Sequence, residues 1–493
     1  MLLDDILENF KKYSNEIAYK SLDNCVTYEQ LYNYVKNIYS YILNSNLDNK
    51  RIIIYGHKEE FMLASFLACS FAGATYIPID SYMAIDRVNN IISEANPDII
   101  FNISGKSIYN KSYKIVELEE LKELCSIKND TTNLVPLMKE DDIYYIIFTS
   151  GTTGIPKGVM ITYKNINSFI KWYNNLMTDK RSIILNQASF SFDLSVADIY
   201  LTLSTGSKLV IIDKSIQRDF NKLFDALNES NAEIAVMTPS FAELLLLDKN
   251  FNSNLMKKLN TIYFCGEVLT SNTAKKIMER FADIRIINSY GPTECTVAVT
   301  EVEITKEMVN LDSLPIGICK EDTEIYIVDD KLNILPDEKT GEILICGESV
   351  AKGYINIQNE KFIFFNGRHG YLTGDIGYYK NGMLWYKCRK DRQIKYRGYR
   401  IELSDIEKNI YKLKYVNKVM VIPEKDEYEK VKNITAFIKL NDNCSKTSLD
   451  IREEVKKYLP EYMRPKIKLV NNFVLNANGK TINPIYKESK NER

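Results

Sequence analysis

An apolar run that passes directly into a loop of Ser, Thr and Gly residues constrains this chain more than any other stretch. Residues 143–148 read Ile-Tyr-Tyr-Ile-Ile-Phe, and a short apolar run bounded by turn residues is typical of a buried strand. The residues that follow offer hydroxyl and backbone N–H groups at close range, which is how proteins hold phosphate groups without covalent chemistry. We therefore expect a phosphate-binding loop that comprises Thr149, Ser150, Gly151, Thr152, Thr153, Gly154 and Lys157.

A flexible linker or a Walker A loop would fit this stretch less well. A linker has a similar composition, but it has no reason to follow a buried strand or to end in Pro156-Lys157-Gly158. A Walker A loop would carry Ser or Thr directly after a Gly-Lys pair, whereas Gly158 follows Lys157 here. The stretch resembles the signature of the adenylate-forming enzymes, which include acyl- and aryl-CoA synthetases, luciferases and the adenylation domains of peptide synthetases.

The composition narrows the class of protein further. The 493 residues suffice for several domains, and 64 basic against 65 acidic residues give a net charge of −1, which favours neither a nucleic acid nor a membrane surface as a partner. Nine cysteines without a CxxC pair and only two histidines argue against a zinc site or a catalytic triad. Thiols in this number fit a reducing cytosol, so we expect a cytoplasmic protein.

One uncharged stretch, residues 61–79, is long enough to raise the question of a membrane span. Gly73 and Pro78 interrupt it. We expect a buried helix to about Ala72, a turn at Gly73 and a strand over 76–79 rather than a span. The N-terminus is acidic and amphipathic, and it lacks the basic region of a signal peptide.

Strand-like and helix-like runs alternate over much of the chain, with strands expected at 51–56, 207–213, 261–266 and 284–291. This alternation predicts an α/β fold of parallel or mixed sheets with helices on their faces, and such sheets bind ligands at the carboxyl ends of their strands. From about residue 316 the pattern changes to short strands and turns. We expect an N-terminal core over 1–390 with a β-rich subdomain over about 316–390, and a small α+β C-terminal domain over 391–493.

A second motif lies in the loop after one of these predicted strands. Its aromatic ring, amide and carboxylate suit a purine face, an exocyclic amine and a Mg²⁺ ion, although Gly-Pro also marks ordinary β-turns. The resemblance implies that this motif holds adenine and, through Glu294, magnesium. The motif comprises Asn288, Ser289, Tyr290, Gly291, Pro292, Thr293 and Glu294.

Two more motifs extend the resemblance to the ribose. Asp375, in Tyr-Leu-Thr-Gly-Asp, can accept both ribose hydroxyls, although a capping Asp is common in any protein. Residues 385–402 look by themselves like a charged surface loop. The resemblance implies that Asp375 binds the ribose and that Tyr386 and Arg389 contact the nucleotide. Cys388 departs from the Gly that the family usually carries there.

A lysine in the tail completes the set. Lys480 follows Asn-Gly, and most lysines in such turns are simply exposed to solvent. The resemblance implies that Lys480 reaches the substrate carboxylate and the α-phosphate, although the residues after it depart from the family pattern. It further implies a mobile C-terminal domain that turns about Asp391, catalytic roles for Thr153, Glu294 and Lys480, and ATP and Mg²⁺ as cofactors.

Three further residues bear on the acid that is activated. Asp193 places a carboxylate in an apolar run, where a buried charge needs a partner such as an ammonium group; a helix N-cap is a serious alternative. A resemblance to the D-alanine–D-alanyl carrier protein ligases runs the full length, for example at 54–61 and 263–270. It implies that Asp193 binds the amino group and that Cys265 and Val297 line the pocket, although cysteine is also a common structural residue.

The resemblance as a whole implies a two-step ligase that adenylates D-alanine and passes it to the phosphopantetheine thiol of a small carrier protein, for teichoic-acid D-alanylation. An enzyme that loads another small amino acid for natural-product synthesis would look nearly the same, because one methyl group is worth only about 1–3 kcal/mol of discrimination. An acyl- or aryl-CoA ligase fits poorly, since an apolar acid gains nothing from Asp193. A non-catalytic nucleotide-binding protein has no need of Lys157, Glu294, Asp375 and Lys480 together.

Overall fold

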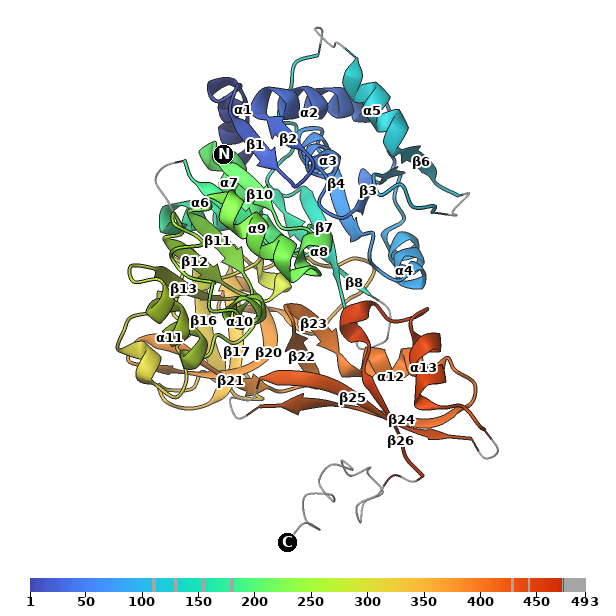
Figure 1. Ribbon diagram of the computed structural model, residues 1–493, viewed down its shortest axis with the longest axis vertical. Helices are drawn as coiled ribbons and strands as arrows, with labels where there is room; N and C mark the ends of the chain where they lie inside the picture. The colour runs from blue at the N-terminus through green and yellow to red at the C-terminus, as the bar shows by residue number, and fades with distance from the viewer. Residues whose placement is uncertain are drawn as a thin grey trace. The chain divides into compact units, whose positions relative to one another are not determined.

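The computed structural model describes residues 1–108, 112–127, 132–151, 156–177, 181–426, 430–441, 444–471 and 473. The chain divides into two compact units (Figure 1). Unit 1 comprises Met1–Ser81, Ile92–Phe148 and Lys157–Lys390. Unit 2 comprises Tyr82–Ile91, Thr149–Pro156 and Asp391–Arg493.

Two large sheets form the body of unit 1. The first has nine strands in the order β15-β14-β13-β12-β11-β9-β10-β1-β2. Its strands are β1 (Ile17–Lys20), β2 (Cys25–Thr27), β9 (Ile183–Asn186), β10 (Lys208–Ile211), β11 (Ile234–Met237), β12 (Thr261–Phe264), β13 (Arg285–Tyr290), β14 (Thr300–Glu303) and β15 (Ile318–Cys319). The strands from β1 to β13 in this order pair in parallel, while β2, β14 and β15 pair antiparallel at the two edges.

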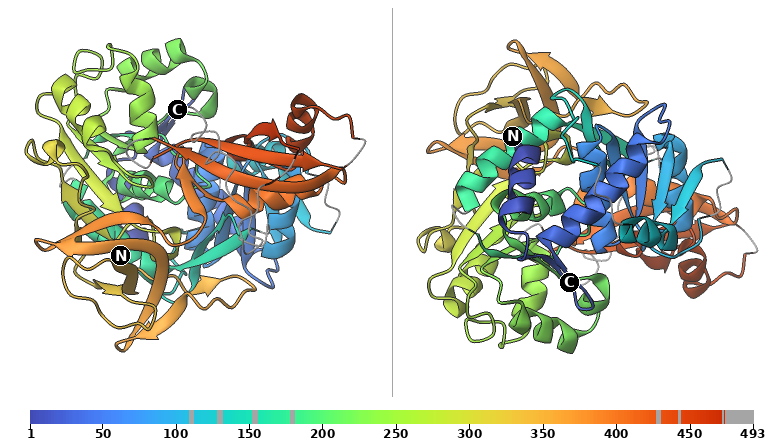
Figure 2. Two further views of the ribbon diagram at one scale, coloured as in Figure 1. Left: turned by 90° about the horizontal axis from the view of Figure 1, so that it is seen from below. Right: turned by 90° about the horizontal axis from the view of Figure 1, so that it is seen from above.

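The second sheet of unit 1 has seven strands in the order β18-β8-β7-β4-β3-β5-β6. They are β3 (Arg51–Gly56), β4 (Thr75–Asp80), β5 (Ile99–Asn102), β6 (Lys114–Glu117), β7 (Ile143–Thr149), β8 (Lys157–Thr162) and β18 (Gly353–Tyr354). Its central pairs β3–β4, β3–β5 and β4–β7 are parallel. The strands β9–β13 (green to olive) lie beside the blue strands β3–β5 in both views of Figure 2, and the predicted α/β class with mixed sheets is confirmed.

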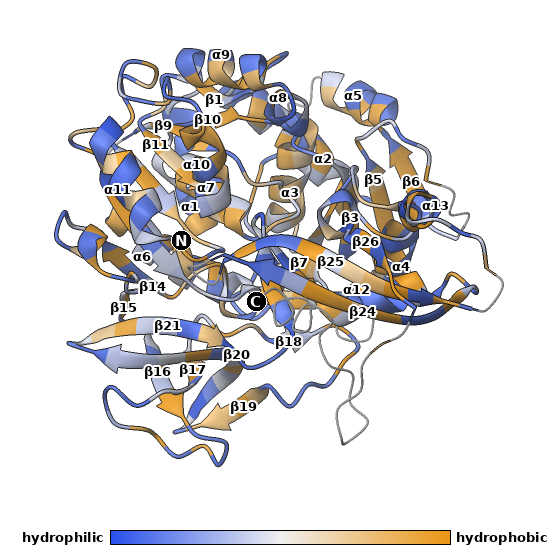
Figure 3. Ribbon diagram, turned by 60° about the horizontal axis from the view of Figure 1, so that its bottom comes forward, coloured by the Kyte–Doolittle hydropathy of each residue, from blue (hydrophilic) through white to orange (hydrophobic). Residues whose placement is uncertain are grey.

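Helices cover and separate these sheets. They are α1 (Leu2–Lys12), α2 (Tyr28–Leu43), α3 (Glu60–Phe71), α5 (Leu118–Ser126), α6 (Tyr163–Met177), α7 (Leu194–Thr205), α8 (Lys214–Gln217), α9 (Phe220–Ser230), α10 (Pro239–Leu246) and α11 (Ser271–Arg280). A further helix, α4 (Ile85–Ala95), begins in unit 2 and ends in unit 1. Outer helices such as α9 alternate hydrophobic and hydrophilic residues around their axes (Figure 3), as a helix with one buried face should. None of the described helices is long and apolar enough to cross a membrane.

The helices α3 and α7 are different, because nearly every residue in them is buried. A helix that is apolar on all sides belongs in the interior, and these two connect the layers of unit 1. The rings of Phe66 in α3 and Phe190 before α7 lie 6.0 Å apart between centroids. The hydroxyls of Tyr76 in β4 and Tyr200 in α7 are 3.0 Å apart. This interior places the start of α7 beside both large sheets.

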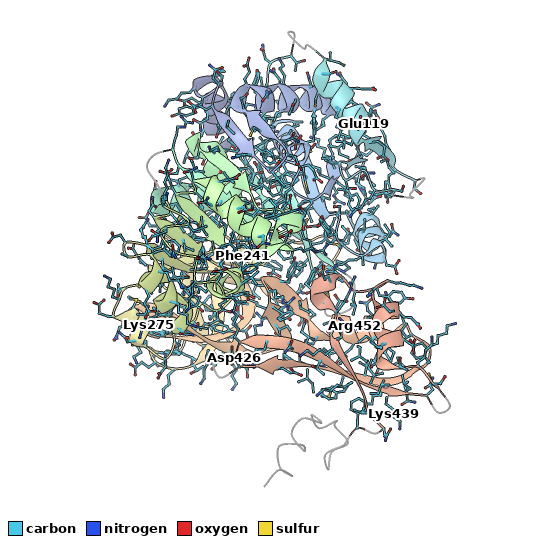
Figure 4. All side chains as sticks on the ribbon, in the orientation of Figure 1. Glu119, Phe241, Lys275, Asp426, Lys439 and Arg452 are labelled. Atoms are coloured by element: carbon cyan, nitrogen blue, oxygen red, sulfur yellow. The ribbon has the colours of Figure 1, made fainter. Side chains whose placement is uncertain are left out.

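Threonine caps fix where two helices begin at the carboxyl ends of strands. Thr238 follows β11 and accepts a hydrogen bond from the N–H of Phe241 (3.3 Å), with Pro239 at the first position of α10. Thr270 caps α11 by accepting from the N–H of Thr273 (3.1 Å). The two helices, marked by Phe241 and Lys275 in Figure 4, pack side by side. These caps satisfy orphan N–H groups and so fix where the two helices begin.

A smaller sheet completes unit 1. Its strands are β16 (Thr323–Val328), β17 (Gly341–Gly347), β19 (Phe362–Phe365), β20 (Arg368–Lys380) and β21 (Met383–Arg389), all paired antiparallel. Two short 3₁₀ helices, η1 (Thr293–Cys295) and η2 (Met308–Asn310), precede it in the chain. The predicted β-rich subdomain is this sheet.

Unit 2 contains a hairpin and a three-stranded sheet with helices. The elements are β22 (Gln393–Tyr396), β23 (Tyr399–Glu402), α12 (Leu403–Tyr411), β24 (Val416–Lys425), β25 (Val431–Leu440), α13 (Ser448–Val455), η3 (Glu461–Met463) and β26 (Lys466–Leu469). Its apolar core includes Ile406 and Ile410 of α12 and Val421 of β24. The predicted small α+β unit at the C-terminus is confirmed as to fold.

Candidate active site

The predicted ribose ligand lies in a tight cluster inside unit 1. Asp375, in the middle of β20, is 2% exposed. Its two carboxylate oxygens accept hydrogen bonds from the hydroxyl of Tyr290 (2.6 Å) and from Nη1 of Arg389 (2.8 Å). Arg389 also donates to the backbone oxygen of Thr373 (2.9 Å). Because Asp375 lies within a strand, it does not cap a helix, and the structure brings three of the predicted nucleotide residues together.

The environment of Tyr290 shows how strongly this cluster is desolvated. Burial raises the pKa of the Tyr290 hydroxyl well above its ordinary value, and the neighbouring charge of Asp375 raises it further. The phenol therefore stays protonated and can only donate to Asp375 at neutral pH.

Two more residues of the predicted nucleotide motifs lie in the neighbouring strand β21. Tyr386 lies opposite Gly377 in the β20–β21 pairing, and the exposed Cys388 lies opposite Ile376.

The other side chains of the predicted adenine motif are used inside the protein. Asn288 donates to the backbone oxygen of Pro315 (2.8 Å). The hydroxyl of Ser289 accepts from Tyr263 (2.8 Å) and donates to the backbone oxygen of Thr300. These bonds anchor the end of β13 and hold the side chains of Asn288 and Ser289 in place.

Glu294 is the buried carboxylate of the same motif. It is 1% exposed, lies in η1 and accepts a hydrogen bond from the hydroxyl of Tyr354 (2.5 Å). The Tyr354 hydroxyl also lies 3.2 Å from that of Tyr371, and Nζ of Lys157 is 5.4 Å from the centre of the Tyr354 ring. A cation and an anion from distant parts of the sequence therefore share one tyrosine.

This donor set fits a Mg²⁺ ion that is bound largely through a substrate. Mg²⁺ commonly takes one or two protein carboxylates and completes its shell with phosphate oxygens and waters. Among the described residues, no group of three or more His, Cys, Asp or Glu side chains could hold a metal by itself. Glu294 could supply the one protein carboxylate, and a nucleotide would have to supply the rest.

The phosphate loop is described only in part. Thr149 ends β7, and Ser150 and Gly151 follow it as buried residues of unit 2. The Ser150 hydroxyl donates to the backbone oxygen of Arg400 (2.8 Å) and accepts from the N–H of Glu402 (3.2 Å). Ser150 is thus engaged by β23 within unit 2. The predicted residues Thr152, Thr153, Gly154 and Lys480 lie outside the described part of the chain.

Asp193 lies at the N-cap position of α7, but its side chain makes no capping hydrogen bond. Its charge acts elsewhere. Burial raises the pKa of the Tyr145 hydroxyl well above its ordinary value, and the charge of Asp193 raises it further. The carboxylate therefore lies within electrostatic range of a buried tyrosine of β7. The interpretation of Asp193 as a helix cap, which the sequence left open, does not describe what this side chain does.

Cys265 and Val297, the two predicted pocket residues, contact each other. Cys265 follows β12, is 3% exposed, and its thiol is 3.8 Å from the backbone oxygen of Val297. Thr296 and Val297 have positive φ angles of 57° and 68°, which are unfavourable for β-branched residues. Backbone strain of this kind persists only where surrounding structure imposes it, and it gathers at functional sites.

Two tyrosines near the predicted carboxylates were missed by sequence reasoning. Tyr354 donates a hydrogen bond to Glu294, and burial together with the charge of Asp193 raises the pKa of Tyr145. Tyr145 lies within the apolar run of β7 and Tyr354 in the two-residue strand β18, and no local signal pairs either of them with a carboxylate. Tyr354 is 60 residues from Glu294 in the sequence, so only the folded arrangement identifies it. Thr373 did carry a signal, because it lies two residues before Asp375 in the Tyr-Leu-Thr-Gly-Asp motif. Its hydroxyl accepts a hydrogen bond from the N–H of Asp375 (3.0 Å).

Comparison with known proteins identifies the family. The family model of the AMP-binding enzymes matches residues 6–355, and that of the AMP-binding enzyme C-terminal domain matches residues 405–480. D-alanine--D-alanyl carrier protein ligases of Bacillus cereus and Bacillus licheniformis are each 37% identical, over 96% of this chain and 97% of the relative.

Solved structures share the fold. The adenylation domain AlmE of Vibrio cholerae, in complex with glycyl-adenosine-5'-phosphate, has a TM-score of 0.84 at 21% identity, over 100% of this chain and 98% of that one. The o-succinylbenzoate CoA synthetase MenE of Bacillus subtilis has a TM-score of 0.83 at 19% identity, over 98% of both chains. With these matches along its length, the chain belongs to the family of AMP-binding enzymes, the adenylate-forming ligases.

Proposed function

We propose that this enzyme adenylates D-alanine with ATP and then transfers it to the phosphopantetheine thiol of a small carrier protein, as a step in teichoic-acid D-alanylation. The position of Asp193 carries this proposal. Its side chain is half-buried at the start of α7 and makes no capping hydrogen bond. A carboxylate at this position would pair with the ammonium group of an amino acid. The Bacillus ligases that match over nearly the full chain support the choice of D-alanine and of a carrier protein.

The first step joins the two substrates. A carboxylate oxygen of the amino acid attacks the α-phosphorus of ATP, a new P–O bond forms, and the bond to pyrophosphate breaks. Negative charge on the phosphoryl oxygens is stabilised by the N–H groups and Thr153 of the phosphate loop and by Lys480. Mg²⁺, when bound at Glu294, supplies further positive charge to the phosphates. Asp375, Tyr290, Tyr386 and Arg389 orient the nucleoside.

The second step releases the activated amino acid to the carrier. The thiol sulfur attacks the carbonyl carbon of the aminoacyl-adenylate, a thioester forms, and AMP leaves with the electrons of the broken C–O bond. We propose that residues 1–390 bind the substrates and that residues 391–493 turn about Asp391 between the steps, which removes Lys480 and admits the thiol.

All nine cysteines, each in the described part of the chain, are thiols, which supports a cytoplasmic location.

A second candidate differs only in the amino acid. The thiol of Cys265 contacts the backbone oxygen of Val297. If these two residues line the amino-acid pocket, they distinguish substrates by size, and a difference of one methyl group is worth only about 1–3 kcal/mol. An enzyme that loads glycine or serine for natural-product synthesis would therefore have nearly the same site. The glycyl-adenylate in AlmE shows that a related fold can hold another small amino acid.

Amino-acid-dependent exchange between ATP and pyrophosphate tests the proposal. We expect strong exchange with D-alanine and weaker exchange with L-alanine, glycine, D-serine and L-serine, and none with a fatty acid. Asp193→Asn should raise KM for the amino acid at least about tenfold, with KM for ATP unchanged, since it removes the charge that pairs with the ammonium group. Asp219→Asn is the matched control, because Asp219 does cap its helix, accepting from the N–H groups of Asn221 and Lys222.

The outcomes separate the candidates. A preference for another amino acid would keep the mechanism and reject D-alanine as the substrate. Exchange with a fatty acid and none with amino acids would reject the role of Asp193 and favour a CoA ligase.

A further inference from the structure

A hydrogen-bonded network links two strand ends of the seven-stranded sheet to the segment that carries Asp193. Gly56 and Asp80 are paired at the carboxyl ends of the parallel strands β3 and β4, and His57 follows Gly56. Nδ1 of His57 lies 2.9 Å from Oδ2 of Asp80. The hydroxyl of Ser189, in the segment between β9 and α7, donates to the same carboxylate oxygen.

The tautomer of His57 follows from its second nitrogen. The backbone N–H of Lys214 donates to Nε2 of His57 (3.2 Å). Nε2 must therefore be the acceptor, and in the neutral imidazole Nδ1 carries the proton and donates it to Asp80. His57 thus connects the end of β4 to the start of α8, and Asp80 receives donors from both His57 and Ser189.

Ser189 in turn holds the turn that leads to Asp193. Its backbone oxygen accepts from the N–H of Phe192 (2.9 Å), and its hydroxyl lies 3.2 Å from that of Ser191. The backbone oxygen of Phe192 accepts from both the N–H (3.0 Å) and the hydroxyl (2.7 Å) of Ser195 in α7. Asp193 lies between these two anchors, so the position of its carboxylate depends on where Ser189 is held.

The residue next to His57 fixes the start of the same segment. Nζ of Lys58 donates to the backbone oxygens of Gln187 and Ile212 (2.8 Å each), which lie one residue beyond β9 and β10. Burial lowers the pKa of Lys58 to about 7, so these two bonds compensate a side chain that has lost its water. His57 and Lys58, the dipeptide after β3, therefore connect the carboxyl ends of strands from both large sheets, at the start of the segment that leads to Asp193.

We propose that His57, through Asp80 and Ser189, is a positioning residue for the amino-acid site, holding the 189–193 turn so that Asp193 meets the substrate ammonium group. This inference rests on the proposed function. His57 itself touches no substrate atom in this role. A displaced turn weakens the pairing of Asp193 with the ammonium group and leaves the nucleotide cluster at Asp375 untouched, because catalytic sites are sensitive to small misplacements.

Variants of His57 test this role. We expect His57→Ala to raise KM for the amino acid about tenfold, with KM for ATP within about twofold of wild type, because a hydrogen-bonded anchor is lost on one side of the site only. Hydrogen exchange should become faster for the amides of residues 187–193. His57→Asn should recover part of the effect, since its side-chain amide can place a donor where Nδ1 lies. The only other histidine, His369, is exposed in β20, and His369→Ala is the matched control.

A double-mutant cycle separates positioning from general destabilisation. If His57 acts through Asp193, His57→Ala should add little to the KM of an Asp193→Asn protein. Fully additive effects, or an equal rise in KM for ATP and for the amino acid, would overturn the proposal. Ser189→Ala removes one hydroxyl from a half-buried position, and this variant takes the place of His57→Ala if the latter does not fold. A Ser189→Ala protein with wild-type KM values would also overturn the proposal.

The wild-type enzyme and its variants distinguish failure of the network from failure of the proposed function. A wild-type enzyme without amino-acid-dependent exchange would reject the proposed function, and with it the substrate role of this network. An active wild type whose His57 and Ser189 variants keep their KM values and their exchange rates at 187–193 would reject only the network.

Discussion

At the scale of single residues, the cluster that we propose binds the nucleotide shows how a buried carboxylate is held in place. Asp375 is nearly inaccessible to water, and a charge in such a place is costly unless donors compensate it. Arg389 supplies one donor and a full charge, and Tyr290 supplies the other. Two donors on opposite oxygens fix the plane of the carboxylate. A fixed plane is what a residue needs to accept both hydroxyls of a ribose.

Tyr290→Phe tests this arrangement. The change removes one donor from Asp375 while the Arg389 bond remains, so we expect KM for ATP to rise about fivefold to tenfold with KM for the amino acid unchanged. Exchange between ATP and pyrophosphate at varied ATP measures it. Tyr379→Phe is the control, since that hydroxyl also donates within the small sheet, to the backbone oxygen of Ile325 (3.2 Å). Equal losses in the two variants would contradict a specific role for Tyr290.

The same scale shows what the sequence could and could not predict. The resemblance to family motifs pointed to Asp375, Arg389 and Glu294, and the structure brings Asp375 and Arg389 into contact. The directions in which the side chains point could not be predicted from local sequence. Asn288 and Ser289 turn into the protein because Pro315 and Thr300, which accept their bonds, arrive from later parts of the chain. Tyr354 was missed for the same physical reason, since its partner Glu294 lies on a different element.

At the scale of elements, the segment from Gly291 to Ala298 doubles back on itself after β13. The N–H of Val299 donates to the backbone oxygen of Tyr290 (2.8 Å). A Cβ at Gly291 would lie 2.6 Å from Cα of Ala298 and 2.8 Å from the backbone oxygen of Val297. Backbone atoms cannot yield as the end of a flexible side chain can. The segment therefore requires glycine, and it carries Glu294 and Val297 on one short turn.

Gly291→Ala should consequently disturb both substrate sites together. We expect a loss of about 1–3 kcal/mol in the free energy of unfolding, and a rise in KM for both ATP and the amino acid. Denaturant unfolding and exchange kinetics measure the two effects. Gly382→Ala is the control for backbone strain alone: its φ of 73° strains an alanine, but a Cβ there meets nothing within 4 Å, so we expect lower stability with both KM values unchanged. Wild-type KM values for Gly291→Ala would show that the turn does not couple the sites.

Asp213 gives an element-scale prediction for pH. It caps α8, and Oδ1 accepts from the N–H groups of Ser215 (2.7 Å) and Ile216 (2.9 Å). Burial alone would raise its pKa, but these bonds outweigh burial and the pKa is lowered. A lowered pKa stabilises the fold above the unfolded value of about 3.9, and this contribution disappears as the pH falls through the folded value.

Asp213→Ala should therefore cost about 1 kcal/mol at neutral pH, and the difference from wild type should shrink in acid. Denaturant unfolding at a series of pH values measures it. Asp213→Asn keeps a neutral acceptor, so we expect a smaller loss that does not depend on pH. A constant difference between Asp213→Ala and wild type down to the lowest pH would contradict the assignment.

Elements with strong periodicity were predictable and weakly buried ones were not. The buried strands β3, β4 and β13 and the helices α3 and α9 follow apolar patterns that the sequence displays. The elements β6 and α5 were missed, because β6 buries only one of its four residues fully and α5 only two of nine. Such elements are stabilised by their neighbours rather than by their own pattern.

At the scale of the whole molecule, the sequence carries little signal that unit 2 is assembled from separated segments. Arg87 and Asp405 form a buried ion pair (3.2 Å) within unit 2, although they are 318 residues apart in the chain. Ser150 bonds to the backbone of Arg400 and Glu402 across a similar separation. Neither contact has a local signal in the sequence, because each depends on how distant segments of the chain pack together in the fold. Composition and periodicity predicted the classes of structure on both sides of residue 390, but not these partners.

The passage between the units, at Lys390 and Asp391, is where we predict the hinge. The Asp391 side chain accepts from the N–H of Gln393 (3.1 Å), a bond within the same short segment. Proline fixes φ near −65°, so Asp391→Pro should keep exchange between ATP and pyrophosphate within about twofold while slowing transfer to the carrier thiol at least about tenfold. Asp391→Ala, which loses the local bond but keeps a free φ, should retain both activities. Equal loss of both steps in the proline variant would mean that residue 391 supports the site and does not act as a hinge.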